Sequence, residues 1–257
     1  MANRISNITR PEIVDWLSSD SKYFELLKES AIKRDDAMFS ALITVGELKV
    51  FCKCFPLQGL KGKLQHWFGK DRARRLHQMT QQLHAAGAPV AESWGYSIEP
   101  GRALWFSQVL PFKSLLHWCG PALPGDKEQR KTILDSSLAA MVALHRAGFF
   151  HGDFKWGNLL FDERNQKIWL VDLDRVKPRS TRQFDKSAAR DVARFMLDCE
   201  EAGMPKDEYL SIVSSYAERV DESVANIQLL VEPIYNVLKA RHDARYGAGF
   251  RLSPPAD

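Results

Sequence analysis

The chain contains no run of eighteen apolar residues, and its first residues form no apolar core of the kind that a secretion signal requires. The sequence therefore predicts neither a membrane-spanning helix nor secretion, and the expected compartment is the cytoplasm. No repeats or low-complexity segments occur, and 257 residues, 45% of them hydrophobic, suffice for one large domain or two lobes. Cysteine is scarce and its spacings match no zinc-binding pattern. We expect the four cysteines to be reduced and buried: Cys52, Cys54, Cys119 and Cys199.

The chain also lacks the glycine-rich motifs that commonly surround nucleotide phosphates. No Gly-x-x-x-x-Gly-Lys segment occurs, and no Gly-x-Gly-x-x-Gly segment precedes the predicted strands, where Gly46 stands alone in a turn. A bound nucleotide would therefore have its phosphates held by a lysine, by metal ions and by main-chain amides.

The most informative segment is residues 151–158, with the sequence HGDFKWGN. A kinase catalytic loop needs a carboxylate that orients and deprotonates the attacking hydroxyl, and an amide oxygen five residues later that holds a metal ion; Asp153 and Asn158 have this spacing. Mg²⁺ prefers oxygen ligands, and Asp172, which follows an apolar strand at residues 168–171, supplies a second one. Each residue alone would be ordinary in a turn, but together with the flanking strands they predict a phosphoryl-transfer site.

The expected elements change in character along the chain. A capping box from Thr9 to Glu12 predicts a helix that begins there, and apolar spacing predicts a second helical piece at residues 23–27. Period-two patterns predict strands at residues 39–45, 48–55, 94–98 and 104–110, with a hairpin turn at Gly46 and Glu47. A helix is expected at residues 70–86, between the second and third of these strands. Helical patterns then dominate, at residues 127–147, 187–202, 206–220 and 223–241.

This order predicts an α+β class with a bilobal protein-kinase-like fold. Residues 1–110 would form a small sheet-rich N-lobe with an N-terminal helical extension and the nucleotide-binding strands. Residues 111–257 would form a larger helical C-lobe with the catalytic loop and the metal-binding aspartate, and the active site would lie in the cleft between the lobes. Residues 206–257 carry no motif that we can interpret, and the sequence does not indicate an oligomeric state.

The sequence resembles the protein-kinase-like superfamily and, within it, the lipopolysaccharide core sugar kinases of Gram-negative bacteria (the Kdo/WaaP type). The likeness covers roughly residues 40–195 and rests on local patterns that include the catalytic loop. These patterns are Lys53 within residues 50–55, the basic stretch that ends at residues 71–75, AAGAP at residues 85–89, residues 151–160, and VDLDR at residues 171–175.

The resemblance implies that the protein is an enzyme, an ATP-dependent phosphotransferase with an alcohol group as acceptor. It also implies a role for each site residue. Lys53 would contact the α- and β-phosphates of ATP, and Asp153 would orient and deprotonate the acceptor hydroxyl. Lys155 would stabilise the transferring phosphoryl group. Asn158 and Asp172 would hold Mg²⁺ near the nucleotide.

Three further residues receive expectations from the same resemblance. His151 would brace the catalytic loop rather than act as an acid or base. Asp191 would be a buried acid that accepts backbone N–H bonds from that loop, with an ordinary solvated helical aspartate as the alternative. Phe51, two residues before Lys53 on the same strand face, would stack on the adenine or narrow its pocket.

The chain also departs from the superfamily pattern. Leu76 stands where the related kinases place the helix glutamate that pairs with the strand lysine, and no glutamate occurs from residue 70 to residue 91. Asp71 is a weak candidate for that pairing; otherwise the ion pair is absent. Only nineteen positions separate Asp172 from Asp191, too few for the long activation segment on which many protein kinases bind peptides, so a peptide substrate is disfavoured.

A basic segment suggests where such a kinase would work. Residues 57–75, which begin with Leu57 and end with Arg75, combine six cationic side chains with Trp67 and Phe68. Each lysine or arginine near an anionic membrane contributes about 1 kcal/mol, so this segment could hold the protein on the cytoplasmic face of the inner membrane, where a lipid-linked core oligosaccharide would be presented. A solvated loop is the alternative, and nucleic-acid binding is not expected, because no binding module accompanies the patch.

Three functions remain open from the sequence. The first is a kinase of a sugar hydroxyl, on heptose or Kdo, in the lipopolysaccharide inner core. The second is a kinase of another acceptor, a small molecule or a protein, which Lys155 allows because Ser/Thr protein kinases carry lysine at that position. The third is a nucleotide-binding pseudokinase, suggested by Leu76 and by the missing glycine loop.

Overall fold

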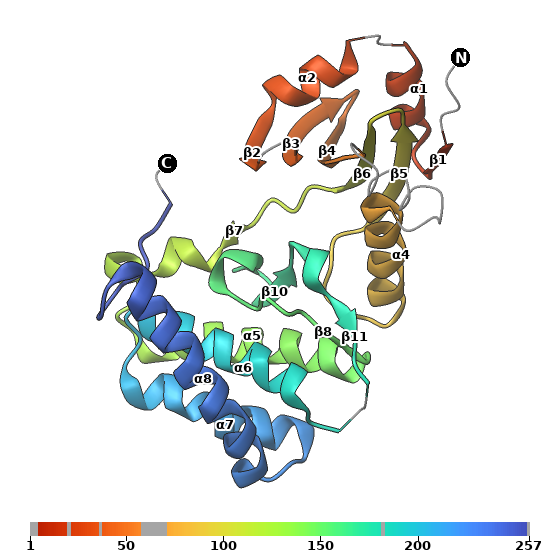
Figure 1. Cartoon of the computed structure of the whole chain (residues 1–257). Helices are drawn as coiled ribbons and strands as arrows, with labels where there is room; N and C mark the ends of the chain where they lie inside the picture. Colours follow the sequence, from red (N-terminus) through yellow and green to blue (C-terminus); the bar gives the residue numbers. More distant parts are fainter. Residues whose placement is uncertain (1–4, 20–21, 36–37, 58–70, 181–182, 256–257) are drawn as a thin grey trace. The chain divides into compact units, whose positions relative to one another are not determined.

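The computed structural model describes residues 5–19, 22–35, 38–57, 71–180 and 183–255, which fold into two compact units (Figure 1). The first unit comprises residues 1–85 and 91–110, and the second comprises residues 86–90 and 111–257. The first is dominated by an antiparallel sheet and the second by helices, in keeping with the predicted α+β class. None of the helices in the described ranges has the length and apolar character needed to cross a membrane.

Within the described residues, the first unit contains a six-stranded antiparallel sheet with the order β1-β5-β6-β4-β3-β2. Its strands are β1 (Ile5–Ile8), β2 (Ala31–Asp35), β3 (Met38–Val45), β4 (Leu48–Pro56), β5 (Ser93–Glu99) and β6 (Arg102–Gln108). The hairpin of β3 and β4 is confirmed: Val45 pairs with Leu48, and Gly46 in the turn has a φ of 60°, which favours glycine. The edge strands β1 and β2 were not foreseen, because segments this short show no clear alternation and become strands by pairing with a neighbour.

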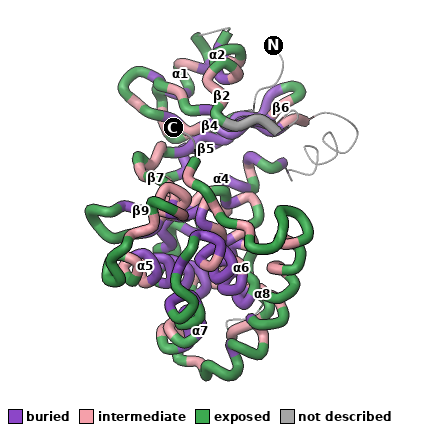
Figure 2. Tube along the Cα trace, turned by 90° about the vertical axis from the view of Figure 1, so that its left-hand side faces the viewer, coloured by how far each residue is buried: buried purple, intermediate pink, exposed green. Residues whose placement is uncertain are grey.

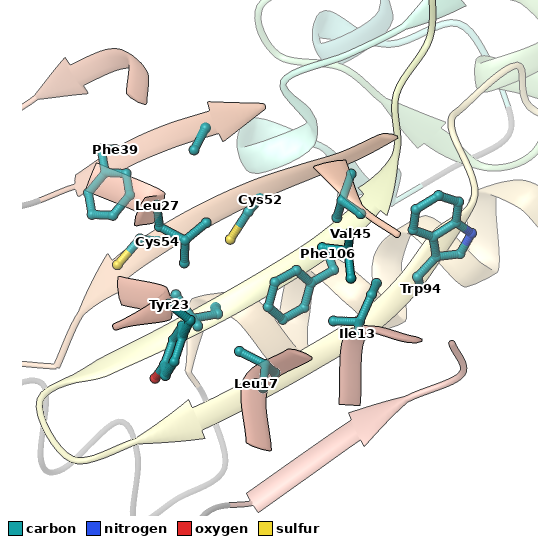
Figure 3. Close-up of a cluster of buried hydrophobic side chains, with 13 residues drawn as sticks. Ile13, Leu17, Tyr23, Leu27, Phe39, Val45, Cys52, Cys54, Trp94 and Phe106 are labelled. Atoms are coloured by element: carbon teal, nitrogen blue, oxygen red, sulfur yellow. The ribbon is translucent and has the colours of Figure 1, made fainter. Parts of the chain in front are cut away.

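Two short helices cover one face of this sheet. They are α1 (Pro11–Ser19) and α2 (Tyr23–Glu29), and both contact β3. Figure 3 shows the resulting core, in which side chains from α1 and α2 point toward those of the strands. Its members include Ile13, Leu17, Tyr23, Leu27, Phe39, Cys52, Cys54 and Phe106. Burial of each large apolar side chain stabilises the unit by about 1.5–3 kcal/mol, and Cys52 and Cys54 are free and buried here, as predicted.

The start of α1 requires one correction. The helix begins at Pro11, as predicted, but Thr9 does not cap it. The amide and hydroxyl of Thr9 both donate to the carbonyl oxygen of Trp94, at 2.8 and 3.2 Å. Thr9 therefore prolongs the pairing of β1 with β5, and the first helical carbonyl that accepts a bond is that of Arg10.

A longer helix, α4 (Arg72–Ala85), packs on the opposite face and contacts β4, β5 and β6. Successive residues of a strand point to opposite faces, so the face of β4 that carries Lys53 lies on the α4 side, whereas Cys52 and Cys54 lie on the α1 and α2 side. The prediction of a helix at residues 70–86 and of two strands after it is confirmed.

The second unit is built around α5 (Lys127–Arg146) and α6 (Lys186–Glu201), where the buried residues of this unit are concentrated (Figure 2). Helix α7 (Lys206–Val220) has the predicted bounds. Side chains cap the N-termini of the longer helices, with Asp126 on α5 and Asp185 on α6 accepting backbone N–H bonds. Gly148, the predicted C-terminal signal of α5, follows the helix with a φ of 85°.

Short strands frame the segment that follows α5. They are β7 (Lys113–Ser114), β8 (Phe149–Phe150), β9 (Leu159–Asp162), β10 (Lys167–Leu170) and β11 (Lys177–Pro178). Strands β10, β9 and β7 form one small sheet, and β11 pairs with β8. The short 3-10 helices are η1 (Leu115–Trp118), η2 (Gly120–Ala122), η3 (Trp156–Asn158) and η4 (Leu173–Arg175).

The last helix, α8 (Val224–Tyr246), gives a structural role to a region whose sequence has no motif. Ser223 caps it by accepting the amide of Asn226 at 3.1 Å, and the helix continues beyond its predicted end. It packs along α6, where the Nζ of Lys239 lies 3.0 Å from the Glu200 carboxylate and the Nδ1 of His242 lies 2.9 Å from the Glu201 carboxylate. Helix α8 thus buttresses the helix that supports the catalytic loop.

Candidate active site

The strand expected to bind nucleotide is β4, on the α4 side of the first unit. Lys53 is 8% exposed, pairs across the ladder with Trp105 of β6, and has its ammonium 6.0 Å from the ring of Phe55. Phe51 is half-buried and meets Trp105 edge-to-face, with ring centroids 6.1 Å apart. The structure therefore surrounds Lys53 with aromatic rings on its own face of the sheet.

The start of α4 explains what Asp71 does. Its buried carboxylate accepts the amide of Arg74 at 2.9 Å, and its second oxygen lies 3.5 Å from the Arg74 Nε. Asp71 therefore serves the N-terminus of α4, and its suggested pairing with Lys53 stays a prediction. Leu76, at the position of the expected glutamate, is 4% exposed and packs as a core residue.

In the second unit, β8 leads into the catalytic loop. Gly152 has a φ of 77°, and a Cβ atom built on it would lie 3.0 Å from the carbonyl oxygen of Arg175. Both the left-handed conformation and the close approach favour glycine at this position. The loop ends in η3, where the amide of Asn158 donates to the carbonyl oxygen of Lys155 at 2.8 Å.

The loop brings together the three polar residues that the motif suggested. The Lys155 ammonium lies 3.1 Å from the Asp153 carboxylate, and both side chains are partly exposed. The Asn158 side-chain amide donates to the Asp153 carbonyl oxygen at 2.9 Å. Because its nitrogen is engaged with the loop, the side-chain oxygen of Asn158 is the atom left to bind a cation.

Asp172 is placed next to this loop by the pairing of β9 with β10. Leu159 pairs with Leu170, and the amide of Val171 donates to the Asn158 carbonyl oxygen at 3.0 Å, so the chain carries Asp172 past the end of the loop. Asp172 is exposed and adopts the left-handed conformation, with φ 56° and ψ 55°.

An amide oxygen and a carboxylate are hard donors of the type that Mg²⁺ prefers, so Asn158 and Asp172 fit this metal. Among the described residues, no cluster of three or more His, Cys, Asp or Glu side chains could hold a metal by itself. A kinase metal needs fewer protein ligands, because nucleotide phosphates and water complete its coordination.

His151 is fully buried beneath the loop. Its Nε2 lies 3.1 Å from the Val171 carbonyl oxygen, and its Nδ1 has no hydrogen-bond partner among the described residues. Burial lowers the pKa of His151, so the neutral imidazole donates from Nε2 to Val171. This geometry matches the expected bracing role, because the ring ties the loop to the end of β10.

Asp191 on α6 is completely buried and holds the start of the loop. Its carboxylate accepts the amide of His151 at 2.6 Å and the amide of Gly152 at 2.8 Å. The Nε2 of His145 lies 3.2 Å away, and its Nδ1 is 2.7 Å from the Tyr216 hydroxyl. The interpretation of Asp191 as a buried acid is confirmed, and the solvated alternative is wrong.

A second buried acid, Asp198, was missed by the sequence analysis. Its carboxylate accepts the amide of Trp156 at 2.7 Å and lies 2.7 Å from the guanidinium group of Arg194. Burial raises the pKa of Asp198 to about 6. A signal was present, because Asp191 and Asp198 are two helical turns apart and both fall on the apolar side of α6.

Comparisons with known proteins identify the family of the chain. The family model described as "Lipopolysaccharide kinase (Kdo/WaaP) family" matches residues 34–216, more than half of the chain. No curated protein sequence matches the chain.

Many solved structures resemble the chain, and two of them serve as examples. The structure "WaaP in complex with acyl carrier protein" has a TM-score of 0.64 and 15% identity, and the match covers 95% of this chain and 99% of that one. The PK-1 kinase of Cydia pomonella granulovirus has a TM-score of 0.44 and 15% identity, over 63% of this chain and 61% of that one. The match to WaaP confirms the predicted protein-kinase-like fold.

The family match also confirms the predicted enzyme class, an ATP-dependent phosphotransferase with an alcohol group as acceptor, which in this family is a sugar hydroxyl. The chain belongs to the lipopolysaccharide kinase (Kdo/WaaP) family.

Proposed function

We propose that this kinase phosphorylates a hydroxyl group of heptose or Kdo in the lipopolysaccharide inner core, with Mg²⁺ as the metal. The observation that carries the proposal is the loop geometry, in which Asp153 lies beside Lys155 and Asn158 while β10 delivers Asp172 next to them. A carboxylate, a cation and two oxygen ligands are the groups that transfer of a phosphoryl group to an alcohol requires.

Each residue has a defined task in this proposal. Asp153 orients the acceptor hydroxyl and takes its proton as the oxygen attacks the terminal phosphorus and ADP leaves. Lys155, 3.1 Å from that carboxylate, stabilises the negative charge on the transferring group. Bound Mg²⁺ and ATP would supply the phosphoryl group and neutralise its charge, with Asn158 and Asp172 as the metal ligands and Lys53 on the α- and β-phosphates.

Phe51 would contact the adenine. The ring is half-buried and is held edge-to-face against Trp105, so its exposed part is fixed in position. A rigid aromatic face on the strand that carries Lys53 is suited to stacking on a base or to limiting the depth of its pocket.

The segment between η4 and α6 supports a non-peptide acceptor. Strand β11 pairs with β8, where Lys177 lies opposite Phe150, and the amide of Arg179 donates to the Gly148 carbonyl oxygen at 2.7 Å. This short segment is tied to the loop's own scaffold and offers little chain for a peptide platform. Another small molecule remains the alternative acceptor, and a pseudokinase remains the alternative suggested by Leu76.

We also propose that the substrate is lipid-linked and that the kinase meets it as a peripheral protein on the cytoplasmic face of the inner membrane. Most of the basic segment that supports this proposal, residues 58–70, lies outside the described residues. In the described part, Arg72 lies 5.2 Å from the Phe55 ring and Arg74 lies 5.5 Å from the Tyr96 ring. An acyl carrier protein is a further partner to test, because WaaP was solved with one.

Phosphate transfer to dephosphorylated core lipopolysaccharide, with labelled ATP and Mg²⁺, tests the function. We expect transfer by the wild-type protein and a loss of at least about a hundredfold in Asp153→Asn and Asp172→Asn. Glu163→Gln, which changes an exposed acid in the turn between β9 and β10, is the matched control and should stay active.

Three other outcomes would each contradict the proposal in a different way. Transfer to peptides but not to core sugar would favour a protein kinase, and transfer only to a soluble small molecule would favour that class of acceptor. Binding of nucleotide without turnover on any acceptor would favour a pseudokinase.

A further inference from the structure

A buried hydrogen-bonded chain links α4 to β6, the strand that pairs with the one that carries Lys53. His77, one residue after Leu76, is 2% exposed, and its Nδ1 lies 2.7 Å from the hydroxyl of Ser93 at the start of β5. The same hydroxyl lies 2.8 Å from the indole nitrogen of Trp105 on β6. We call His77, Ser93 and Trp105 the tryptophan relay.

Chemistry fixes the direction of the relay. An indole N–H can only donate, so Trp105 donates to the Ser93 oxygen. Among the described residues, the Nδ1 of His77 is the acceptor that the Ser93 hydroxyl proton can reach, and in this arrangement Nδ1 is unprotonated. Burial lowers the pKa of His77 and favours the same neutral form.

The relay ends beside the residues proposed to bind nucleotide. Trp105 lies directly opposite Lys53 in the pairing of β4 with β6, and its ring and that of Phe51 form a T-shaped pair. Trp105 is 7% exposed, and residues directly opposite each other on neighbouring strands have Cβ atoms about 4.5–5.5 Å apart, so the indole lies next to the lysine stem. A shift of this ring would move both Phe51 and Lys53.

Helix α4 is also seated on the next strand. Tyr96 of β5 lies opposite Trp105 in the sheet, its ring centroid is 5.6 Å from that of His77, and the Arg74 guanidinium lies 5.5 Å from it. These contacts place His77 where it can transmit the position of α4 to the sheet. Leu76 cannot do so by a polar contact, because its side chain carries no donor or acceptor.

We propose that His77 is a positioning residue for nucleotide binding, which acts through Ser93 to hold the Trp105 indole against Lys53 and Phe51. The relay would do with neutral hydrogen bonds what an ion pair between a helix glutamate and the strand lysine does in protein kinases. The inference rests on the proposed role of Lys53 in phosphate binding.

A pair of nearly isosteric variants tests the relay. The side-chain oxygen of asparagine can replace Nδ1 as an acceptor, whereas that of glutamine lies near the position of Nε2. We expect His77→Asn to keep the KM for ATP within about twofold of wild type and His77→Gln to raise it about tenfold, as for the loss of one buried hydrogen bond, with kcat within about twofold in both. Equal impairment of both variants, or a changed kcat with an unchanged KM, would overturn the proposal in favour of simple packing.

A second measurement keeps the relay separate from the function of Lys53. In protein labelled with ¹⁵N-tryptophan, the Trp105 indole signal is assigned by its loss in Trp105→Phe. It should shift in His77→Gln and Ser93→Ala and stay in place in His77→Asn; an unmoved signal in Ser93→Ala would refute the relay itself.

Lys53→Ala provides the control for the proposed function. If this variant binds ATP as tightly as wild type, the assignment of Lys53 fails, whatever the indole signal shows. If Lys53→Ala weakens binding and His77→Gln does not, the relay has no positioning role and the proposal is overturned.

Discussion

Replacement of Asp191 should reveal how much of the catalytic loop's order depends on one buried carboxylate. Asp191 accepts three hydrogen bonds, from the amides of His151 and Gly152 and from the ring of His145. In Asp191→Ala the two amides and the imidazole lose their acceptor inside the protein.

The magnitude follows from these contacts. Each buried donor left without a partner costs about 1–3 kcal/mol, and Gly152 is only partly buried, so that its amide can recover some hydration. We therefore expect Asp191→Ala to lower the free energy of unfolding by about 3–5 kcal/mol, a large share of the about 5–15 kcal/mol typical of a domain. Asp191→Asn should cost less, because its amide oxygen can still accept one of the bonds.

Urea denaturation followed by circular dichroism measures the change, and transfer activity measured well below the transition shows whether the loop is displaced while the protein is folded. Glu232→Gln, at an exposed position of α8, is the control and should change the stability by less than about 0.5 kcal/mol. A loss of less than about 1 kcal/mol in Asp191→Ala, with normal activity, would show that the carboxylate does not hold the loop.

Two further predictions concern pH and the membrane. Burial raises the pKa of Glu201 from 4.5 to about 7, so the native state binds a proton more tightly than the unfolded chain does. The native state therefore loses up to about 3 kcal/mol of stability as the pH rises through that range. The melting temperature of Glu201→Gln relative to wild type should be higher at pH 8 than at pH 5, and a difference that does not change with pH would contradict this. Separately, sedimentation with anionic liposomes should fall on charge reversal of three basic residues, Lys61, Lys63 and Lys70, and unchanged sedimentation would remove the support for membrane binding.

The two buried acids on α6 divide the support of the loop between them. Asp191 holds its beginning through the amides of His151 and Gly152, and Asp198 holds its end through the amide of Trp156. The partly exposed groups Asp153 and Lys155 lie between these anchors, so one helix holds the reactive segment at both of its ends.

The missing helix glutamate does not leave α4 without polar contact to the sheet. The tryptophan relay connects this helix to β5 and β6 through a neutral histidine, in the same unit as Lys53. Leu76 is therefore insufficient reason to consider the protein inactive, and the intact set of Asp153, Asn158 and Asp172 favours an active kinase.

The sequence by itself determined what is encoded over short distances. The catalytic loop has its carboxylate and amide five positions apart, so the motif could be read without knowing the fold. Most helices and the four central strands of the first unit followed from local periodicity, and the hairpin at Gly46 followed from its turn. The roles of His151 and Asp191 came from resemblance to known kinases, and the structure supplied the bonds that confirm them.

Only the tertiary structure decided the interactions between distant segments. The bond from Trp156 to Asp198 joins residues 42 positions apart, and the relay joins α4 to two strands that follow it. The edge strands β1 and β2 likewise depend on their neighbours. No local pattern specifies such contacts, because a histidine, a serine or an aspartate becomes a positioning group only when folding removes water and places one particular partner within hydrogen-bonding distance.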